Sequence, residues 1–322
     1  MRAIVITGPD RSLILTDVPE PVPGPDDLLV DVAAAGVNRA DLLQAAGLYP
    51  PPPGAPQWPG LEVSGTVAAV GGAVTGWTVG DRLVALLPGG GYAQRVAVPA
   101  GLALPVGDDL DLVDAAGLPE ALATVWSTLA RAGFSAGDSV LVRGGSGGIG
   151  TVAVQLARAA GARVLATAGG AERCARVRAL GVDVVVDHRE PGLVDAVLAA
   201  TDGRGVDVVL DVVGAAALGE NLTVLADDGR LAIIGLQRGQ RGELDLGLMM
   251  AKRASLVVTA LRSRPLSQRL AIVADVREHV WPMVKDGRIR PVVHAHLPLA
   301  QAAEAHRAMA AGEPFGKVLL LA

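Results

Sequence analysis

The stretch SVLVRGGSGGIG, residues 139–150, sets the architecture of this chain. Its apolar segment, residues 140–142, runs into glycines at 144, 145, 147, 148 and 150, and the small-residue helical pattern TVAVQLARAAG follows. The order of apolar run, glycines and helical pattern predicts a strand, a tight turn and a helix.

Within this stretch, Gly145, Gly147 and Gly150 have the G-x-G-x-x-G spacing of a dinucleotide-binding turn. Such glycines allow the turn, admit a pyrophosphate against bare backbone and let the helix pack closely on the strand. A second apolar segment, residues 163–168, arrives after a short turn. We therefore expect a nucleotide site, with phosphate bound at the helix N-terminus.

Downstream of the glycines, apolar segments alternate with helical patterns. Strands are expected near 140–143, 164–168, 183–187, 206–212, 230–235 and 255–261, and helices near 149–160, 171–180, 191–200, 215–226 and 246–253. Six buried strands alternating with helices predict an α/β fold with a doubly wound, parallel, six-stranded Rossmann sheet.

The first 118 residues instead show short apolar runs separated by proline- and glycine-rich turns, which favours a small β-barrel. One helix, residues 38–45, interrupts them with Asn38 as a possible N-cap, and a rigid proline loop follows. Near the C-terminus we expect one long helix, residues 265–286, and a closing strand, 317–321, that pairs in the first domain. The predicted division is 1–120, 121–263 and 264–322, where the last part returns to the first domain.

Composition excludes several classes of protein. No apolar run has the length of a membrane span, and the N-terminus lacks the pattern of a signal peptide, so we expect a cytoplasmic protein. A net charge of −5 with scattered arginines argues against a nucleic-acid surface. The single cysteine, Cys174, excludes an internal disulfide and any cysteine-cluster metal site.

The end of the second predicted strand bears on the choice of cofactor. NAD-preferring sites place a carboxylate there for the ribose hydroxyls, but this strand ends in Thr167, Ala168, Gly169 and Gly170. Arg173 follows in the next helix, where its guanidinium can pair with a 2′-phosphate, unless it is simply a solvated helix residue. We therefore expect NADPH rather than NADH.

Several segments together resemble the quinone oxidoreductase group of the medium-chain dehydrogenase/reductases, similar to zeta-crystallin. They are GVNRADLLQAAGLYPPPPG, PGLEVSGTVAAVG, GDRLVALLPGGGYAQRVAVP, the GGSGGIG turn and FGKVLLL. VNRADL, ALLPGGG and the late LRSR segment resemble most the branch that contains the tumour-suppressor-inducible quinone oxidoreductase. The resemblance implies a GroES-like domain formed by both termini, with a Rossmann domain inserted between them.

The resemblance also bears on metal chemistry. Zinc-dependent relatives carry a cysteine and a histidine as catalytic zinc ligands where this chain has Asn38 and Leu61, and only the neighbouring Glu62 is kept. We therefore expect no metal. Without a Lewis acid, alcohol oxidation loses its main stabilisation, whereas reduction of a quinone or an α,β-unsaturated carbonyl does not depend on one.

The resemblance implies the site residues. Asn38 would hold the acceptor oxygen, and Tyr49 would line the pocket or donate a proton, unless it is an ordinary loop aromatic. His188 stands where relatives have a tyrosine, and its protonated form would suit a 2′-phosphate. Lys317 is either a cofactor contact or a solvated strand residue. The full set of implied cofactor-binding residues is Thr124, Gly145, Ser146, Gly147, Gly148, Ile149, Gly150, Gly170, Arg173, His188, Gly235, Leu236, Ser263 and Lys317.

We therefore expect an NADPH-dependent, zinc-independent quinone reductase with a small-molecule acceptor. One alternative is an enoyl or enone reductase, although the first domain offers no basic cluster for the phosphates of a long acyl thioester. Another is a non-catalytic NADPH-binding structural protein. Members of the group commonly dimerise through the sixth Rossmann strand, here residues 255–261, which predicts a homodimer.

Overall fold

The structure is a computed structural model that describes all residues, 1–322. The chain forms two compact units. The first comprises Met1–Ala123, Leu261–Asp286 and Pro291–Ala322, and the second comprises Thr124–Ala260 and Gly287–Arg290.

The first unit is built mainly from short strands. Its elements are β1 (Arg2–Thr7), β2 (Ser12–Asp17), β3 (Asp27–Gly36), α1 (Arg39–Ala45), β4 (Glu62–Val70), β5 (Arg82–Leu86), β6 (Arg95–Pro99), β7 (Ala103–Pro105), α2 (Leu112–Ala115), α9 (Leu266–Asp275), α10 (Trp281–Lys285), β14 (Val293–Pro298), α11 (Ala302–Ala311) and β15 (Lys317–Leu321). Helix α3 (Pro119–Arg131) begins in this unit and continues into the second.

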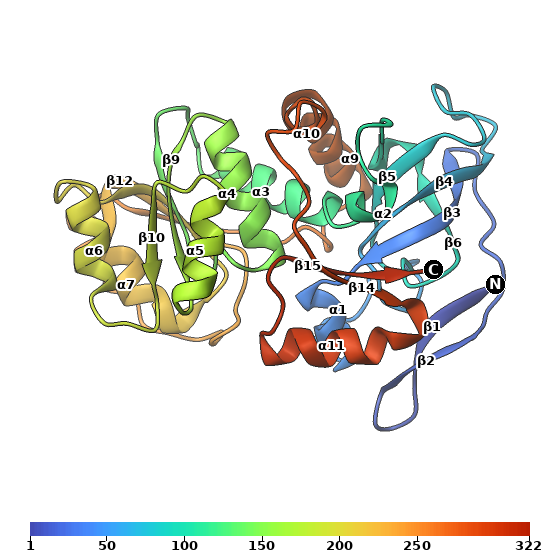
Figure 1. Cartoon of the computed structure of the whole chain (residues 1–322), viewed down its shortest axis with the longest axis horizontal. Helices are drawn as coiled ribbons and strands as arrows, with labels where there is room; N and C mark the ends of the chain where they lie inside the picture. The colour runs from blue at the N-terminus through green and yellow to red at the C-terminus, as the bar shows by residue number, and fades with distance from the viewer. The chain divides into compact units, whose positions relative to one another are not determined.

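Strand β3 organises the sheet of the first unit. It pairs antiparallel with β4 along one edge, and with β6 and β15 along the other. Alternate side chains of β3, Leu28, Val30, Val32 and Ala34, are buried in the core, as the period of a strand requires. Because β15 pairs with β3, the last residues of the chain lie beside an early strand (Figure 1).

The second unit alternates strands and helices. Its elements are β8 (Ser139–Val142), α4 (Gly148–Ala159), β9 (Arg163–Ala168), α5 (Ala171–Ala179), β10 (Val184–Asp187), α6 (Leu193–Ala200), β11 (Val206–Asp211), α7 (Leu218–Thr223), β12 (Leu225–Ile233), α8 (Leu246–Ala251) and β13 (Ser255–Val258). All six strands are parallel in the order β10-β9-β8-β11-β12-β13, which confirms the predicted Rossmann sheet. The strand order reverses between β8 and β11, where such sheets bind their ligands.

The strand predicted over 230–235 spans Leu225–Ile233, and the one predicted over 255–261 ends at Val258. Two predicted helices also differ from the structure. The helix expected over 215–226 ends at Thr223, because the carbonyl of Val224 accepts a hydrogen bond from Val206 and draws the chain into β12. The long helix expected over 265–286 is interrupted by a π turn over Val276–Val280, closed by a bond from the N–H of Trp281 to the Val276 carbonyl. Pro282 follows, and its missing N–H removes the next regular helical bond.

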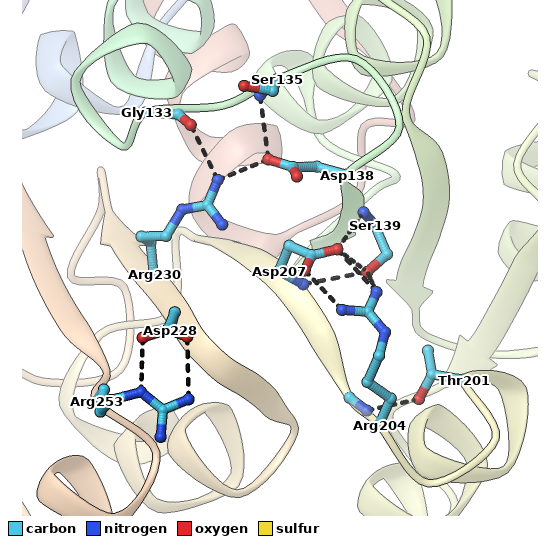
Figure 2. A network of polar contacts seen from close by, with 11 residues as sticks. Gly133, Ser135, Asp138, Ser139, Thr201, Arg204, Asp207, Asp228, Arg230 and Arg253 are labelled. Atoms are coloured by element: carbon cyan, nitrogen blue, oxygen red, sulfur yellow. Dashed lines mark hydrogen bonds and ion pairs between the residues drawn. The ribbon is translucent and has the colours of Figure 1, made fainter.

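Ion pairs tie the N-terminal ends of the central strands together (Figure 2). The carboxylate of Asp207 accepts hydrogen bonds from the N–H and Oγ of Ser139, each 2.7 Å long, and pairs with Arg204 at 2.7 Å. The Arg204 guanidinium holds the pKa of Asp207 well below its usual range. Arg230 binds Asp138 at 2.6 Å. The network therefore joins β8 to β11, at the ends of these strands remote from the glycine turn.

No helix combines the length and the apolar composition needed to cross a membrane.

Candidate functional site

The glycine turn lies at the C-terminal end of β8. The N–H of Gly145 donates to the Thr167 carbonyl at 2.8 Å, and the N–H of Gly144 donates to the Thr167 hydroxyl at 3.0 Å. Gly144 has a φ of +82°, a conformation that favours glycine. The turn is thus fastened to the end of β9 before α4 begins at Gly148.

The three glycines of the predicted fingerprint have different surroundings. A Cβ at Gly150 would lie 2.1 Å from the Gly144 carbonyl oxygen, so α4 can approach the turn only with glycine here. A Cβ at Gly145 would lie 3.0 Å from that of Ala166. At Gly147 the nearest protein atom would be 3.7 Å away, so the protein itself leaves room there. An open position of this kind in front of a helix N-terminus fits a pyrophosphate.

A carboxylate does lie close to the end of β9, but it already accepts hydrogen bonds from backbone N–H groups. Asp187, the last residue of β10, accepts two bonds from the N–H of Gly170, at 2.9 and 3.0 Å. These bonds, with another from the N–H of Arg189, lower the pKa of Asp187. No local pattern pointed to this role, because Asp187 lies on the neighbouring strand.

Two basic side chains lie against the glycines that end β9. A Cβ at Gly169 would lie 2.9 Å from His188 Nε2 and 3.0 Å from Arg189 Nε. Burial lowers the pKa of His188, as do the charges of Arg143, Arg189 and Arg238, although Asp187 opposes them. The hypothesis of a protonated His188 is therefore not supported. Arg189 was missed by sequence reasoning, and its only signal was its place directly after the third strand.

The other implied cofactor residues of the second unit lie mostly near the C-terminal ends of the parallel strands. Ser146 and Ile149 belong to the glycine turn and the start of α4, and the half-buried Arg173 lies in the first turn of α5. Gly235 and Leu236 follow β12, and Leu236 is exposed. Thr124 lies in α3. Ser263, an exposed residue, belongs to the first unit.

The first unit buries a polar cluster made of Asn38, Glu62 and Lys317. Asn38 follows β3, Glu62 begins β4 and Lys317 begins β15, so the cluster depends on the pairing of these strands. The ammonium of Lys317 donates to Asn38 Oδ1 at 2.7 Å and forms a short ion pair with Glu62. Glu62 is 0% exposed and Lys317 3%. The alternative of a solvated strand residue is therefore wrong for Lys317.

The amide of Asn38 is fully engaged within the cluster. Its Nδ2 donates to Glu62 Oε1 at 2.8 Å and to the Gly36 carbonyl at 3.3 Å, while its oxygen accepts from Lys317. Asn38 is also the N-cap residue of α1. Direct donation from this amide to an acceptor oxygen would break one of the bonds that the structure shows. The predicted catalytic role of Asn38 stays a prediction.

Asp41 fixes the backbone of Asn38. Its buried carboxylate accepts from the N–H of Asn38 at 2.8 Å, from the N–H of Gly60 at 2.9 Å and from the Tyr92 hydroxyl at 3.3 Å. Burial raises the pKa of Asp41 to about 6. The Tyr92 hydroxyl also contacts His306 Nε2 at 3.2 Å, and burial lowers the pKa of His306 to about 4. Asp41 thus acts by orienting its neighbours.

Arg262 fastens the loop that carries Tyr49. Its guanidinium donates to the carbonyls of Pro88 at 2.7 Å and Tyr49 at 3.2 Å, and to Gln44 Oε1 at 2.6 Å. It also lies over the ring of half-buried Tyr49, 5.2 Å from the centroid. The sequence marked the LRSR segment only by resemblance, whereas the structure gives Arg262 this positioning role. The role of Tyr49 itself stays a prediction.

The residues of the first-unit cluster do not fit a catalytic zinc ion. No group of three histidine, cysteine, aspartate or glutamate side chains is arranged to hold a metal. Leu61 offers no donor atom, and the only carboxylate of the cluster is already paired with the ammonium of Lys317. A second cation beside Glu62 would face that ammonium, so electrostatic repulsion opposes it.

Comparisons with known proteins agree with this architecture. Residues 24–108 match the alcohol dehydrogenase GroES-like domain family, and residues 148–276 match the zinc-binding dehydrogenase family. The chain is 34% identical to the quinone oxidoreductase of Thermus thermophilus, solved alone and with NADPH, with a TM-score of 0.86 over 100% of both chains. The CurK enoyl reductase is 26% identical, with a TM-score of 0.87 over 99% of this chain and 98% of that one.

Among curated proteins, the chain is 34% identical over 325 residues to the mycocerosic acid synthase-like polyketide synthase of Mycolicibacterium smegmatis. This match covers 99% of the chain but only 15% of that much longer protein. The two family matches and the full-length similarity to solved reductases lead to one conclusion: the chain belongs to the medium-chain dehydrogenase/reductase superfamily.

Proposed function

We infer that the chain is an NADPH-dependent reductase of electron-poor acceptors, with quinones as its substrates. The observation that carries this inference is the Asn38–Glu62–Lys317 cluster, in which an ammonium is paired with the carboxylate of Glu62. By the resemblance, zinc-dependent relatives bind the Lewis acid for alcohol oxidation beside this position. The similarity to a quinone oxidoreductase crystallised with NADPH supports both the acceptor and the cofactor. Within the superfamily, the zeta-crystallin-like branch fits these features.

The second unit supplies the proposed cofactor site. The open position at Gly147 and the N-terminus of α4 would receive the pyrophosphate. Arg189, Arg173 and the neutral ring of His188 would hold the 2′-phosphate, because the guanidinium groups that lower the pKa of His188 also create a positive potential. The bound cofactor supplies a hydride from nicotinamide C4. The acceptor domain, proposed to comprise residues 1–120 and 264–322, would hold the acceptor through Tyr49 and the buried cluster.

Arg189→Ala is expected to raise the KM for NADPH about tenfold or more and to change the KM for NADH little, because only NADPH carries the 2′-phosphate. Arg173→Ala tests the neighbouring guanidinium in the same way. Arg253→Ala, an exposed arginine paired with Asp227 and Asp228, is the matched control. Steady-state kinetics with both cofactors measure the ratio. Equal effects on NADPH and NADH would remove the substituted arginine from the site.

A second candidate is an enoyl or enone reductase. The similarity to the CurK enoyl reductase and to a polyketide synthase favours it, and hydride addition to a conjugated carbonyl needs the same residues. Turnover of 1,4-benzoquinone, 1,2-naphthoquinone and a crotonyl thioester distinguishes the two. Faster turnover of the thioester would replace the quinone assignment. A protein that binds NADPH tightly but reduces none of these acceptors would instead be a non-catalytic binding protein.

A homodimer through β13 is part of the proposal. This strand is the last of the six-stranded sheet and ends at Val258, three residues before the predicted end. Leu256 and Val258 are 36% and 60% exposed, so a second copy would cover apolar surface and pair the free edge. Sedimentation should give twice the chain mass of 32.6 kDa. Val258→Lys should give the monomer, and a monomeric parent protein would contradict the proposal.

A further inference from the structure

We propose that Glu120 is the proton donor of the reduction, supplying the proton that the acceptor takes up after it receives the hydride. The inference rests on the proposed reductase function and adds the identity of the acid. An acidic residue in the first turn of a helix is common, because it suits the helix dipole, so the sequence pattern PEALATVW alone did not single out Glu120.

Glu120 lies directly beside the buried cluster. Glu120 is the second residue of α3, and its backbone N–H donates to Glu62 Oε2 at 2.9 Å. The other oxygen of Glu62, Oε1, accepts a hydrogen bond from Asn38 Nδ2 and pairs with the ammonium of Lys317. Both oxygens of Glu62 therefore accept hydrogen bonds. Glu120 thus contacts the buried cluster through its backbone N–H, and its carboxyl takes no part in the hydrogen bonds of the cluster.

The Glu120 carboxyl has no hydrogen-bond or ion-pair partner, although the residue is only partly exposed. Arg269 of α9, whose charge interacts with that of Glu120, likewise has two buried guanidinium nitrogens, Nε and Nη1, without partners. Polar groups left unpaired at such a position cost stability unless a ligand or substrate completes them.

The charges around Glu120 favour its protonated form. Burial is the largest influence, and the carboxylates of Glu62 on β4 and Asp41 on α1 act in the same direction. Lys317 on β15 and Arg262 oppose them. The net effect raises the pKa of Glu120 to about 8, so the carboxyl carries its proton at neutral pH.

The other candidate acids of the first unit are poorer. The hydrogens of the Asn38 amide are engaged, and Lys317 is held by Glu62. Burial and the charge of Glu120 raise the pKa of Tyr49, which weakens its hydroxyl as an acid. Burial lowers the pKa of His306, so its ring is neutral. Asp41, with a pKa of about 6, is fully buried, and its carboxylate is held by the N–H groups of Asn38 and Gly60. Glu120 remains the partly exposed group with a proton to give and a pKa close to neutral pH.

The step balances in atoms and charge. Hydride adds to the β-carbon of the conjugated acceptor, and the displaced electron pair moves onto the carbonyl oxygen. The O–H bond of Glu120 then breaks, and its proton goes to the α-carbon of the enolate or to an oxygen of the hydroquinone anion. The Glu120 carboxylate regains a proton from solvent, which its partial exposure permits. Thr124, the nicotinamide contact implied by resemblance, follows four residues later in α3, about one helical turn.

The test compares Glu120→Gln, Glu120→Asp and Glu304→Gln, the last removing an exposed carboxyl from the first turn of α11. With an enone acceptor at pH 7, Glu120→Gln should lower kcat about 100-fold and leave the KM for NADPH unchanged. The loss should be smaller with a quinone, because water can protonate a hydroquinone anion at oxygen. Glu304→Gln should behave as the parent.

The dependence of kcat on pH shows whether Glu120 acts in its protonated form. A general acid works only while protonated, so kcat of the parent should be level below about pH 8 and fall above it, and Glu120→Asp should keep an alkaline limb. Glu120→Gln should lose this alkaline limb. A Glu120→Gln variant with parental kcat and an unchanged alkaline limb would overturn the proposal.

A readout without turnover separates this proposal from the proposed function. Infrared difference spectra of the parent protein should show a protonated carboxyl band that disappears above pH 8 and is absent from Glu120→Gln. If the band is missing, Glu120 is not the acid even in an active reductase. If the band is present but no acceptor is reduced, the reductase assignment fails while the protonated carboxyl stands, and Glu120 is then no proton donor.

Discussion

Lys317→Met is expected to lower the free energy of unfolding by about 3–5 kcal/mol, because it leaves the Glu62 carboxylate buried without its cation. Asn38 and the N–H of Glu120 would remain as its only hydrogen-bond donors. Urea unfolding followed by tryptophan fluorescence measures the loss.

The double variant Glu62→Gln/Lys317→Met is the matched comparison. It removes both charges, so it should recover a large part of the stability that the single substitution loses. Arg253→Met breaks exposed ion pairs to Asp227 and Asp228 and should leave stability nearly unchanged. Equal losses of unfolding free energy in the single and double variants would show that the two buried charges do not stabilise each other.

Gly150→Ala is expected to abolish NADPH binding and to destabilise the second unit by about 1–3 kcal/mol. Its methyl group would lie 2.1 Å from the Gly144 carbonyl oxygen, so the turn or α4 must shift. Thermal unfolding and a titration of NADPH fluorescence measure both effects.

Gly147→Ala is the matched variant, because its methyl group would meet no protein atom closer than 3.7 Å. The fold should therefore keep its stability, while the methyl group occupies the space left for the pyrophosphate and weakens NADPH binding about tenfold or more. If Gly147→Ala binds NADPH as the parent does, the phosphate does not lie against this residue.

Most of the second unit was predicted correctly from local sequence patterns. Apolar strand segments, helical patterns and glycine spacing are local signals, and they predicted the six parallel strands and the turn after β8. The errors lie where backbone pairing or a missing N–H overrides the local pattern, as at Val224 and Pro282. The role of Asp187 was hidden, because parallel pairing of β9 and β10 brings it to Gly170.

Residue types at fixed spacing were enough to predict the fold class and the glycine turn, and the resemblance to a known family identified the positions of zinc ligands that lack cysteine and histidine here. The roles of Asn38, Glu62 and Lys317 instead came from tertiary packing. Their strands are far apart in the sequence, and the pairing of β3 with β4 and β15 places an ammonium against a carboxylate and an amide. The same packing partly buries Glu120 beside Glu62 and raises its pKa, and desolvation of this kind is a property of the assembled core.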